Sequence, residues 1–179
     1  MTRTLTRTDW LDHALQEVAA KGPAALRAQS LAKSLGVSRG SFYWHFADID
    51  AFHDALITHW SERTNDSMMA DILATIPVAD QLTTLLMRTF RSGAALERAL
   101  RAWATHAPKM AGRIAEVDAR RIGYAVDILK RTGLADAEAT ARARLLYWAA
   151  IGRLMMPDAP HRHLSDAEIT GLAKLMARA

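Results

Sequence analysis

Apolar side chains recur every three to four residues along most of the 179-residue chain. This period matches the turn of an α-helix, and the alternating runs of β-branched residues that are typical of strands do not occur. Gly and Pro separate the periodic segments. We therefore predict an all-α protein with helices at about 9–21, 27–35, 38–46, 48–76, 78–92, 94–106, 109–131, 136–155 and 165–178.

The first three predicted helices are short and lie close together in the sequence. The first begins at Thr8 as N-cap and ends at Gly22-Pro23. A long fourth helix from Asp48 joins this small head to a larger helical body. We predict two domains, residues 1–47 and 48–179.

The second and third helices have the pattern of a helix-turn-helix. A tight turn of this kind needs a small residue where the helices cross, a glycine in the left-handed conformation and apolar anchors on the second helix. Ala32 and Gly36 fill the first two roles, and Val37 and Phe42 fill the third. Ser38 stands at the N-cap position of the third helix. In this geometry the N-terminal turn of the third helix can lie in the DNA major groove.

The exposed face of that helix carries side chains that suit DNA. With Val37, Phe42 and Phe46 inward, Arg39 can bind guanine bidentately and Gly40 lets the backbone approach the duplex. Ser41 can bond a base edge or phosphate, and Tyr43 and His45 can donate to phosphates. The predicted DNA-binding residues are Gln29, Ser38, Arg39, Gly40, Ser41, Tyr43, Trp44 and His45.

Residues 8–60 resemble the DNA-binding head of the TetR/AcrR family of bacterial transcriptional regulators. The resemblance rests on Leu31-Ala32-x-x-Leu35-Gly36-Val37-Ser38-x-Gly40-x-Phe42-Tyr43-x-His45-Phe46 and the acid-capped helix that follows. Tyr43-Trp44-His45 is similar to the triplet of the tetracycline repressor. One position departs from the family: Ile49 stands where a phosphate-binding Lys is common, which predicts a weaker backbone contact and a shallower salt dependence.

The resemblance implies a helix-turn-helix DNA-binding domain at 1–47 and a ligand-binding and dimerisation domain at 48–179. It implies a homodimer through the last two helices that binds a palindromic double-stranded operator, most often as a repressor, and is released by a small effector. Aromatic and Met side chains in the body indicate that this effector is largely apolar. The candidate ligand-binding residues are Met87, Phe90, Trp103, His106, Tyr124 and Trp148.

A small all-α enzyme that uses a body cavity and His106 is the alternative function. The sequence has no recognisable nucleophile–base pair and no cofactor motif, so we predict neither catalysis nor a cofactor. His161 and His163, with Asp158 and Asp166 nearby, are the one metal-like group in the sequence. A short surface loop does not fix ligand geometry, and we predict no metal site.

Composition and charge change this picture little. There is no Cys, no apolar run approaches the roughly 18 residues of a membrane span, and no signal-peptide core follows the basic N-terminus; we expect a cytoplasmic protein without membrane contact. The net charge is +4 but is unevenly distributed. Residues 1–46 carry six Lys/Arg and three Asp/Glu, residues 47–80 carry one and seven, and residues 81–179 carry 16 and nine.

Overall fold

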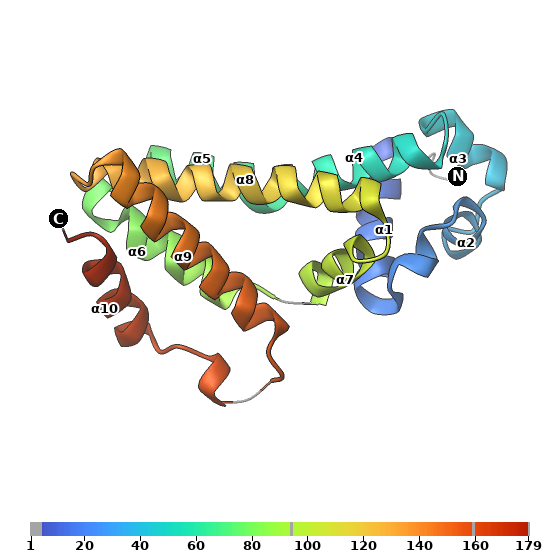
Figure 1. Cartoon of the computed structure of the whole chain (residues 1–179). Coiled ribbons are helices and arrows are strands. Elements are labelled where there is room, and N and C mark those ends of the chain that lie inside the picture. The colour runs from blue at the N-terminus through green and yellow to red at the C-terminus, as the bar shows by residue number, and fades with distance from the viewer. Residues whose placement is uncertain (1–4, 94, 159, 179) are drawn as a thin grey trace. The chain divides into compact units, whose positions relative to one another are not determined.

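The computed structural model describes residues 5–93, 95–158 and 160–178 (Figure 1). Within these ranges all regular structure is helical and no strand occurs, which confirms the all-α prediction. The chain forms two compact units: unit 1 is Met1–Arg63 with Ala94–Ile114, and unit 2 is Thr64–Gly93 with Ala115–Ala179. This division by compactness differs from the predicted division by function at residue 47, which stays a prediction.

Unit 1 combines the predicted head with two segments from farther along the chain. The helices of unit 1 are α1 (Arg7–Lys21), the 3₁₀ turn η1 (Pro23–Leu26), α2 (Ala28–Ser34), α3 (Arg39–His45), α4 (Ile49–Ser61), α7 (Ala95–Ala104) and the first part of α8 (Pro108–Arg131). Among them, α1 packs against α4 and α7. The largest buried side chains of the unit are Trp10, Leu31, Phe42, Phe52, Leu56, Trp60, Leu100 and Met110.

Unit 2 is built around a second apolar core. The unit contains α5 (Ser67–Thr75), α6 (Val78–Arg91), the rest of α8, α9 (Asp136–Met155), the 3₁₀ turn η3 (Pro160–Arg162) and α10 (Asp166–Met176). Within it, α6 packs against α5 and α10. Its core includes Met69, Ile72, Leu82, Leu86, Phe90, Ile128, Leu129, Leu146 and Ile169.

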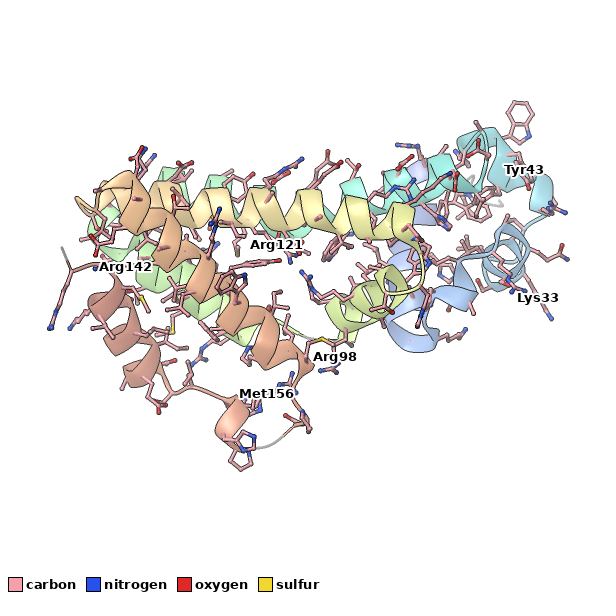
Figure 2. The ribbon with its side chains drawn as sticks, viewed as in Figure 1. Lys33, Tyr43, Arg98, Arg121, Arg142 and Met156 are labelled. Atoms are coloured by element: carbon pink, nitrogen blue, oxygen red, sulfur yellow. The ribbon has the colours of Figure 1, made fainter. Side chains whose placement is uncertain are left out.

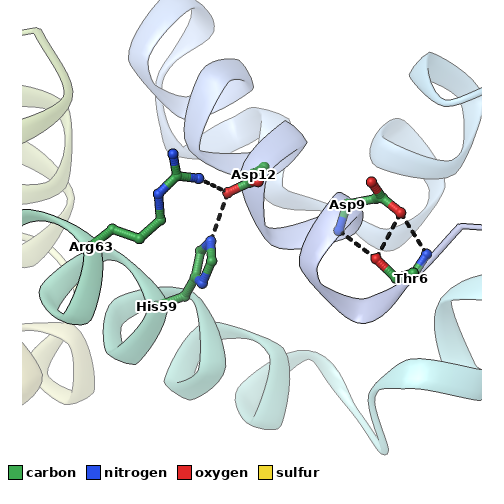
Figure 3. Close-up of polar contacts among 5 residues, drawn as sticks. All are labelled: Thr6, Asp9, Asp12, His59 and Arg63. Atoms are coloured by element: carbon green, nitrogen blue, oxygen red, sulfur yellow. Dashed lines mark hydrogen bonds and ion pairs between the residues drawn. The ribbon is translucent and has the colours of Figure 1, made fainter. Parts of the chain in front are cut away.

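Helix α1 begins earlier than predicted. Its N-cap is Thr6, whose hydroxyl accepts a hydrogen bond from the Asp9 backbone N–H at 3.2 Å. The Asp9 carboxylate accepts from the Thr6 N–H at 2.8 Å, which completes a capping box (Figure 3). The prediction of Thr8 was wrong because the third residue after Thr8 is Leu11, which cannot bond back to the cap.

The predicted long helix at 48–76 is helical but not uniform. Residues Glu62–Asp66 form a π-helical stretch between α4 and α5. Within it the Asn65 side chain is buried, and its Oδ1 accepts a hydrogen bond from Arg121 Nε of α8 at 2.9 Å. A contact between residues so far apart in sequence leaves no local pattern, so the hydrophobic period did not predict the wider turn.

Four of the seven acidic residues of 47–80 form ion pairs with basic residues of their own units, which accounts for part of the positive charge of the body. The pairs are Asp50–Lys109, Asp54–Arg113, Asp66–Arg120 and Asp71–Arg88. Hydrogen bonding to Lys109 lowers the pKa of Asp50. Exposed pairs of this kind contribute at most about 1 kcal/mol each, and their effect is to neutralise the acidic segment.

Candidate nucleic-acid interface

The turn between α2 and α3 is fixed by its backbone. Gly36 has φ +69°, the left-handed conformation that the sequence predicted. The Val37 N–H donates to the Ala32 carbonyl at 3.0 Å and the Gly36 N–H donates to the Lys33 carbonyl at 3.2 Å. These two bonds form a Schellman motif, which satisfies carbonyl groups at the end of α2 and turns the chain into α3.

Helix α3 is anchored by Phe42, which is fully buried. Its ring centroid lies 5.6 Å from Trp10 of α1, 5.1 Å from Phe46 and 5.2 Å from Phe52 of α4. Aromatic pairs at these distances stabilise by about 0.5–1.5 kcal/mol each beyond the burial of their area. The inward positions of Phe42 and Phe46 are as predicted, whereas Val37 is only half-buried. This cluster determines which face of α3 is presented to solvent.

The predicted DNA-binding residues lie on or beside that outer face. Tyr43 is 46% exposed and Trp44 is 89% exposed, and Figure 2 shows Tyr43 on α3 with Lys33 on the neighbouring α2. Of the others, Gln29, Ser38, Arg39 and Gly40 are exposed, while Ser41 and His45 are half-buried. The His45 ring lies 6.5 Å from the Trp10 ring. An 89% exposed indole is unusual for a folded protein and points to an external partner.

Arg39 and Tyr43 interact with each other one helical turn apart. Arg39 Nη2 donates to the Tyr43 hydroxyl at 3.0 Å, and the guanidinium lies 5.5 Å from the centre of the Tyr43 ring. This arrangement holds the guanidinium at the surface with donors still available to a guanine edge or a phosphate. Ser38 occupies the N-cap position of α3, but its hydroxyl makes no capping hydrogen bond. The predicted N-cap position of Ser38 is confirmed, although its side chain contributes no hydrogen bond to the cap.

Gly40 has no packing reason to be glycine. A Cβ at this position meets only Ser38 Oγ, at 3.7 Å, which is ordinary van der Waals contact. Glycine within a helix costs about 0.5–1 kcal/mol relative to alanine. The lack of an internal reason supports the prediction that Gly40 permits a close approach from outside.

Helix α4 begins directly after α3 and carries the departure from the family pattern. Asp48 is its N-cap and accepts from the Ala51 N–H at 2.7 Å. Ile49 is 39% exposed. Of the two acidic residues that flank Ile49, Asp50 is paired with Lys109. The start of α4 therefore presents an apolar side chain in place of a cation.

Asp12 of α1 connects that helix to the last turn of α4 and the residues after it (Figure 3). Its Oδ1 lies 2.7 Å from His59 Nε2, and the same oxygen pairs with Arg63. The hydrogen bond to His59 lowers the pKa of Asp12, burial opposes this shift, and Arg63 adds to it. These contacts fix α4 against the scaffold that also anchors α3.

The candidate ligand residues are divided between the two units. Trp103 and His106 belong to unit 1, where the Trp103 ring lies 4.6 Å from the His53 ring and His106 is exposed. In unit 2, Phe90 is buried, Met87 is half-buried and the Tyr124 hydroxyl donates to Asp66 at 2.6 Å. Trp148, also in unit 2, is 64% exposed. Their joint role in one pocket stays a prediction.

Two arginines of unit 2 were not among the candidates. Arg153 of α9 and Arg162 of η3 are almost completely buried. They lie nine residues apart in different elements, and only the tertiary structure shows their environment, so no motif in the sequence marks them.

Among the described residues, no group of three or more His, Cys, Asp or Glu side chains is arranged to hold a metal ion. His163 Nε2 lies 2.9 Å from Asp158 Oδ1. Across the same part of the chain, every helix is too short or too polar to cross a membrane.

Comparison with known proteins agrees with this geometry. Residues 11–56 match the family model described as bacterial regulatory proteins, tetR family. The matched segment contains most of α1, the whole helix-turn-helix and the first half of α4. Comparison with curated protein sequences finds no match.

Solved structures share the fold over nearly the whole chain. GusR from Salmonella enterica is 22% identical, with a TM-score of 0.74 and 97% of each chain covered. A TetR transcriptional regulator from Legionella pneumophila is 14% identical, with a TM-score of 0.71 and coverage of 98% of this chain and 97% of that one. The transcriptional regulator FadR from Bacillus subtilis, in complex with stearoyl-CoA, is 15% identical, with a TM-score of 0.72 and coverage of 96% and 98%.

The resemblance inferred from the sequence is confirmed by these matches. Proteins of this family are transcriptional regulators rather than enzymes. The chain therefore has the N-terminal helix-turn-helix domain of the tetR family of bacterial regulatory proteins and, over its length, the fold of a TetR-family transcriptional regulator.

Proposed function

We propose that this protein is a cytoplasmic, homodimeric repressor that binds a palindromic operator through α3 and is released by a small effector. The observation that carries the DNA-binding part is the outer face of α3. Arg39, Gly40, Tyr43 and the 89% exposed Trp44 form one surface on a helix that Phe42 anchors from behind. The helix-turn-helix geometry directs such a surface into the major groove.

The dimer is proposed from a second exposed surface, on α9 and α10. Leu145, Trp148 and Met155 of α9 are 52%, 64% and 56% exposed, and Leu175 of α10 is 59% exposed. Ala149 and Gly152 are exposed at the same helical spacing. Exposed apolar side chains on two helices are suited to pair with a second copy in a four-helix interface.

The effector part of the proposal concerns linkage between two conformations. FadR, a structural neighbour, is in complex with stearoyl-CoA. Here α4 begins directly after the recognition helix and continues through the π-helical stretch into α5. An effector that binds one conformation of the body more tightly than the other changes operator affinity by the ratio of its two affinities.

A binding assay tests the DNA-contact residues. Fluorescence anisotropy is measured with a duplex recovered by selection from random DNA. Arg39→Ala should weaken operator binding by about 5- to 150-fold, since a good base contact is worth roughly 1–3 kcal/mol, and Tyr43→Ala should weaken it through loss of a phosphate donor. Lys21→Ala is the matched control: it removes an exposed cation that pairs with Glu17 on α1, and operator affinity should change less than twofold. Unchanged sequence-specific binding by the first two variants contradicts the assignment of α3.

A further inference from the structure

Two arginine side chains in unit 2 are nearly buried without a matching set of acidic partners. Arg153, in the last turn of α9, is 8% exposed. The side chain of Arg162, in η3, is 9% exposed. Met156, labelled in Figure 2, marks the end of α9 between them. Arginines are rarely so buried unless their charge is paired.

The hydrogen bonds of Arg153 do not neutralise its charge. Its Nη2 donates to the Thr89 carbonyl at 3.2 Å, near the end of α6, and its guanidinium lies 5.8 Å from the centre of the Phe90 ring. Both partners are uncharged. The buried Nε atom has no hydrogen-bond partner among the described residues.

Arg162 has one acidic partner, and that partner is poorly placed. Its Nη1 lies 3.3 Å from Asp158 Oδ1, while the Asp158 side chain is 79% exposed and also bonds His163. The buried Nε of Arg162, like that of Arg153, has no partner within the described part of the chain. Burying an N–H of a charged group without a hydrogen-bond acceptor is costly, because the group loses its hydration and gains nothing in return.

The two guanidinium groups influence each other. Burial lowers the pKa of Arg153, and the positive charge of Arg162 lowers it further. Arginine stays protonated in proteins despite such shifts. Two buried like charges therefore lie at the end of α9 and in the turn η3, and each has an Nε donor without a partner among the described residues.

We propose that Arg153 and Arg162 bind the oxyanion group, a carboxylate or a phosphate, of an amphipathic effector. The inference rests on the proposed function, because it assigns a ligand class to the effector of the body. Guanidinium groups form charge-assisted, often bidentate hydrogen bonds with both kinds of oxyanion. An anion at this position supplies the opposite charge that the partners of Arg153 lack and reduces the repulsion between the guanidinium groups. The Phe90 ring, 5.8 Å from the guanidinium of Arg153, belongs to the apolar core of unit 2, so the surroundings of Arg153 suit a ligand whose remainder is apolar.

Calorimetric titration of the full chain tests the site in the absence of DNA. The probes are octanoate, octyl phosphate and octanol, which share one alkyl chain and differ in the charge and type of the head group. At least one anion should bind tenfold or more tightly than octanol, and the preferred anion identifies the head group. Equal affinity for octanol, or no binding of either anion, overturns the proposal.

Variants assign the binding to these residues. Arg153→Met and Arg162→Met keep side-chain length and remove the charge, and each should reduce anion affinity by at least tenfold. Arg131→Met, at an exposed arginine in the last turn of α8, is the matched control and should stay within twofold. Circular dichroism checks the fold, and Arg162 in its short turn provides the test if Arg153→Met does not fold. Anion binding that survives both substitutions contradicts the site.

Operator binding measured in parallel separates this site from the proposed function. If anion binding requires both arginines but operator affinity does not change, the anion site is supported and release of the operator by that anion is contradicted. Release of the operator by a neutral compound, with no anion binding, keeps the proposed function and contradicts the site.

Discussion

Two exposed tryptophans, one in each unit, share similar local features but differ in the residues near them in the sequence. Trp44 on α3 is 89% exposed and follows Gly40 by four residues; Trp148 on α9 is 64% exposed and precedes Gly152 by four. A Cβ at Gly152 meets no atom within 4 Å, and at Gly40 it meets only one at ordinary contact distance. Each surface therefore combines a large ring with a helix backbone that another molecule can approach.

The neighbours of the two rings differ, and this difference indicates the partner. Trp44 shares α3 and its N-cap with Arg39, Tyr43 and Ser38, whose donors suit phosphates and base edges. Trp148 lies among Leu145, Ala149 and Met155, which offer no hydrogen bonds and suit an apolar surface. An open glycine alone marks no contact, since Gly112 and Gly123 of α8 also have nothing within 4 Å of an added Cβ. The combination with an exposed aromatic ring and its neighbours supports the two proposed interfaces.

Substituting glutamate for each tryptophan tests the proposed difference between the two surfaces most directly. Trp148→Glu should raise the dimer dissociation constant at least 100-fold, because burying an unpaired carboxylate in an apolar interface costs several kcal/mol. Trp44→Glu should leave the dimer intact and weaken operator binding about 10- to 100-fold through repulsion from phosphates. Sedimentation velocity and operator anisotropy measure the two effects. A dimer lost in Trp44→Glu and kept in Trp148→Glu reverses the assignment.

Introducing a lysine at position 49, where related proteins commonly carry one, tests the proposed DNA-binding surface alone. Ile49→Lys at the start of α4 should tighten operator binding and steepen its salt dependence, with log K changing by about 0.9 more per tenfold change in salt for each phosphate contacted. Operator affinity measured from 50 to 300 mM salt gives the slope. Ile49→Gln, polar but uncharged, is the control. An unchanged slope in Ile49→Lys means that this position does not reach the DNA backbone.

The packing behind the DNA-facing side should respond to acid through His53. Burial, followed by the charge of Arg113, lowers the pKa of His53, which the nearby Asp50 and Asp54 only partly offset. A base with a lowered pKa in the folded state is stabilising when neutral, so its contribution is complete above about pH 6.5, the ordinary value, and is lost as the pH falls through the folded pKa. The free energy of unfolding, measured with urea, should fall more between pH 7.5 and pH 5.5 for the native chain than for His53→Phe.

A matched histidine distinguishes this effect from general acid sensitivity. His106→Gln changes an exposed side chain and should keep the native pH dependence. Equal losses in the native chain and in His53→Phe contradict the role of His53.

The smallest expected effect separates folding from function at Gly40. Gly40→Ala should raise the free energy of unfolding by about 0.5 kcal/mol, since alanine favours helix and no clash opposes it here. It should weaken operator binding several-fold because the Cβ lies at the approach to DNA. Gly123→Ala on α8 should give a similar gain in stability with unchanged operator binding. Unchanged operator binding in Gly40→Ala means that the backbone does not approach DNA at this residue.

Local signals in the sequence predicted the helix-turn-helix well. Gly36, Val37 and Phe42 lie within a few residues of one another, so their spacing in the sequence was sufficient to predict the turn and the side chains that anchor the third helix. The cap of α1 also had a local signal, because Thr6 has Asp9 three residues later while Thr8 has Leu11. That signal was present in the sequence and was misread.

Long-range contacts were not predictable in this way. The π-helical stretch accompanies a bond between Asn65 and Arg121, and the charge of α4 is balanced by Lys109 and Arg113 of α8. The sequence places these partners 56 or 59 residues apart. Nothing in local composition relates them, and the same holds for the burial of Arg153 and Arg162. The body was consequently less predictable than the head, because its chemistry depends on tertiary packing.

Selection of bound sequences from a random DNA pool tests the central claim most directly. The account predicts an enriched inverted repeat whose half-sites lie about one helical turn, roughly 10 base pairs, apart. It also predicts that the pool selected by the Arg39→Ala, Tyr43→Ala double variant shows no such repeat. Recovery of no common sequence by the native chain, or of the same repeat by the double variant, contradicts the proposal that α3 reads an operator as part of a dimer.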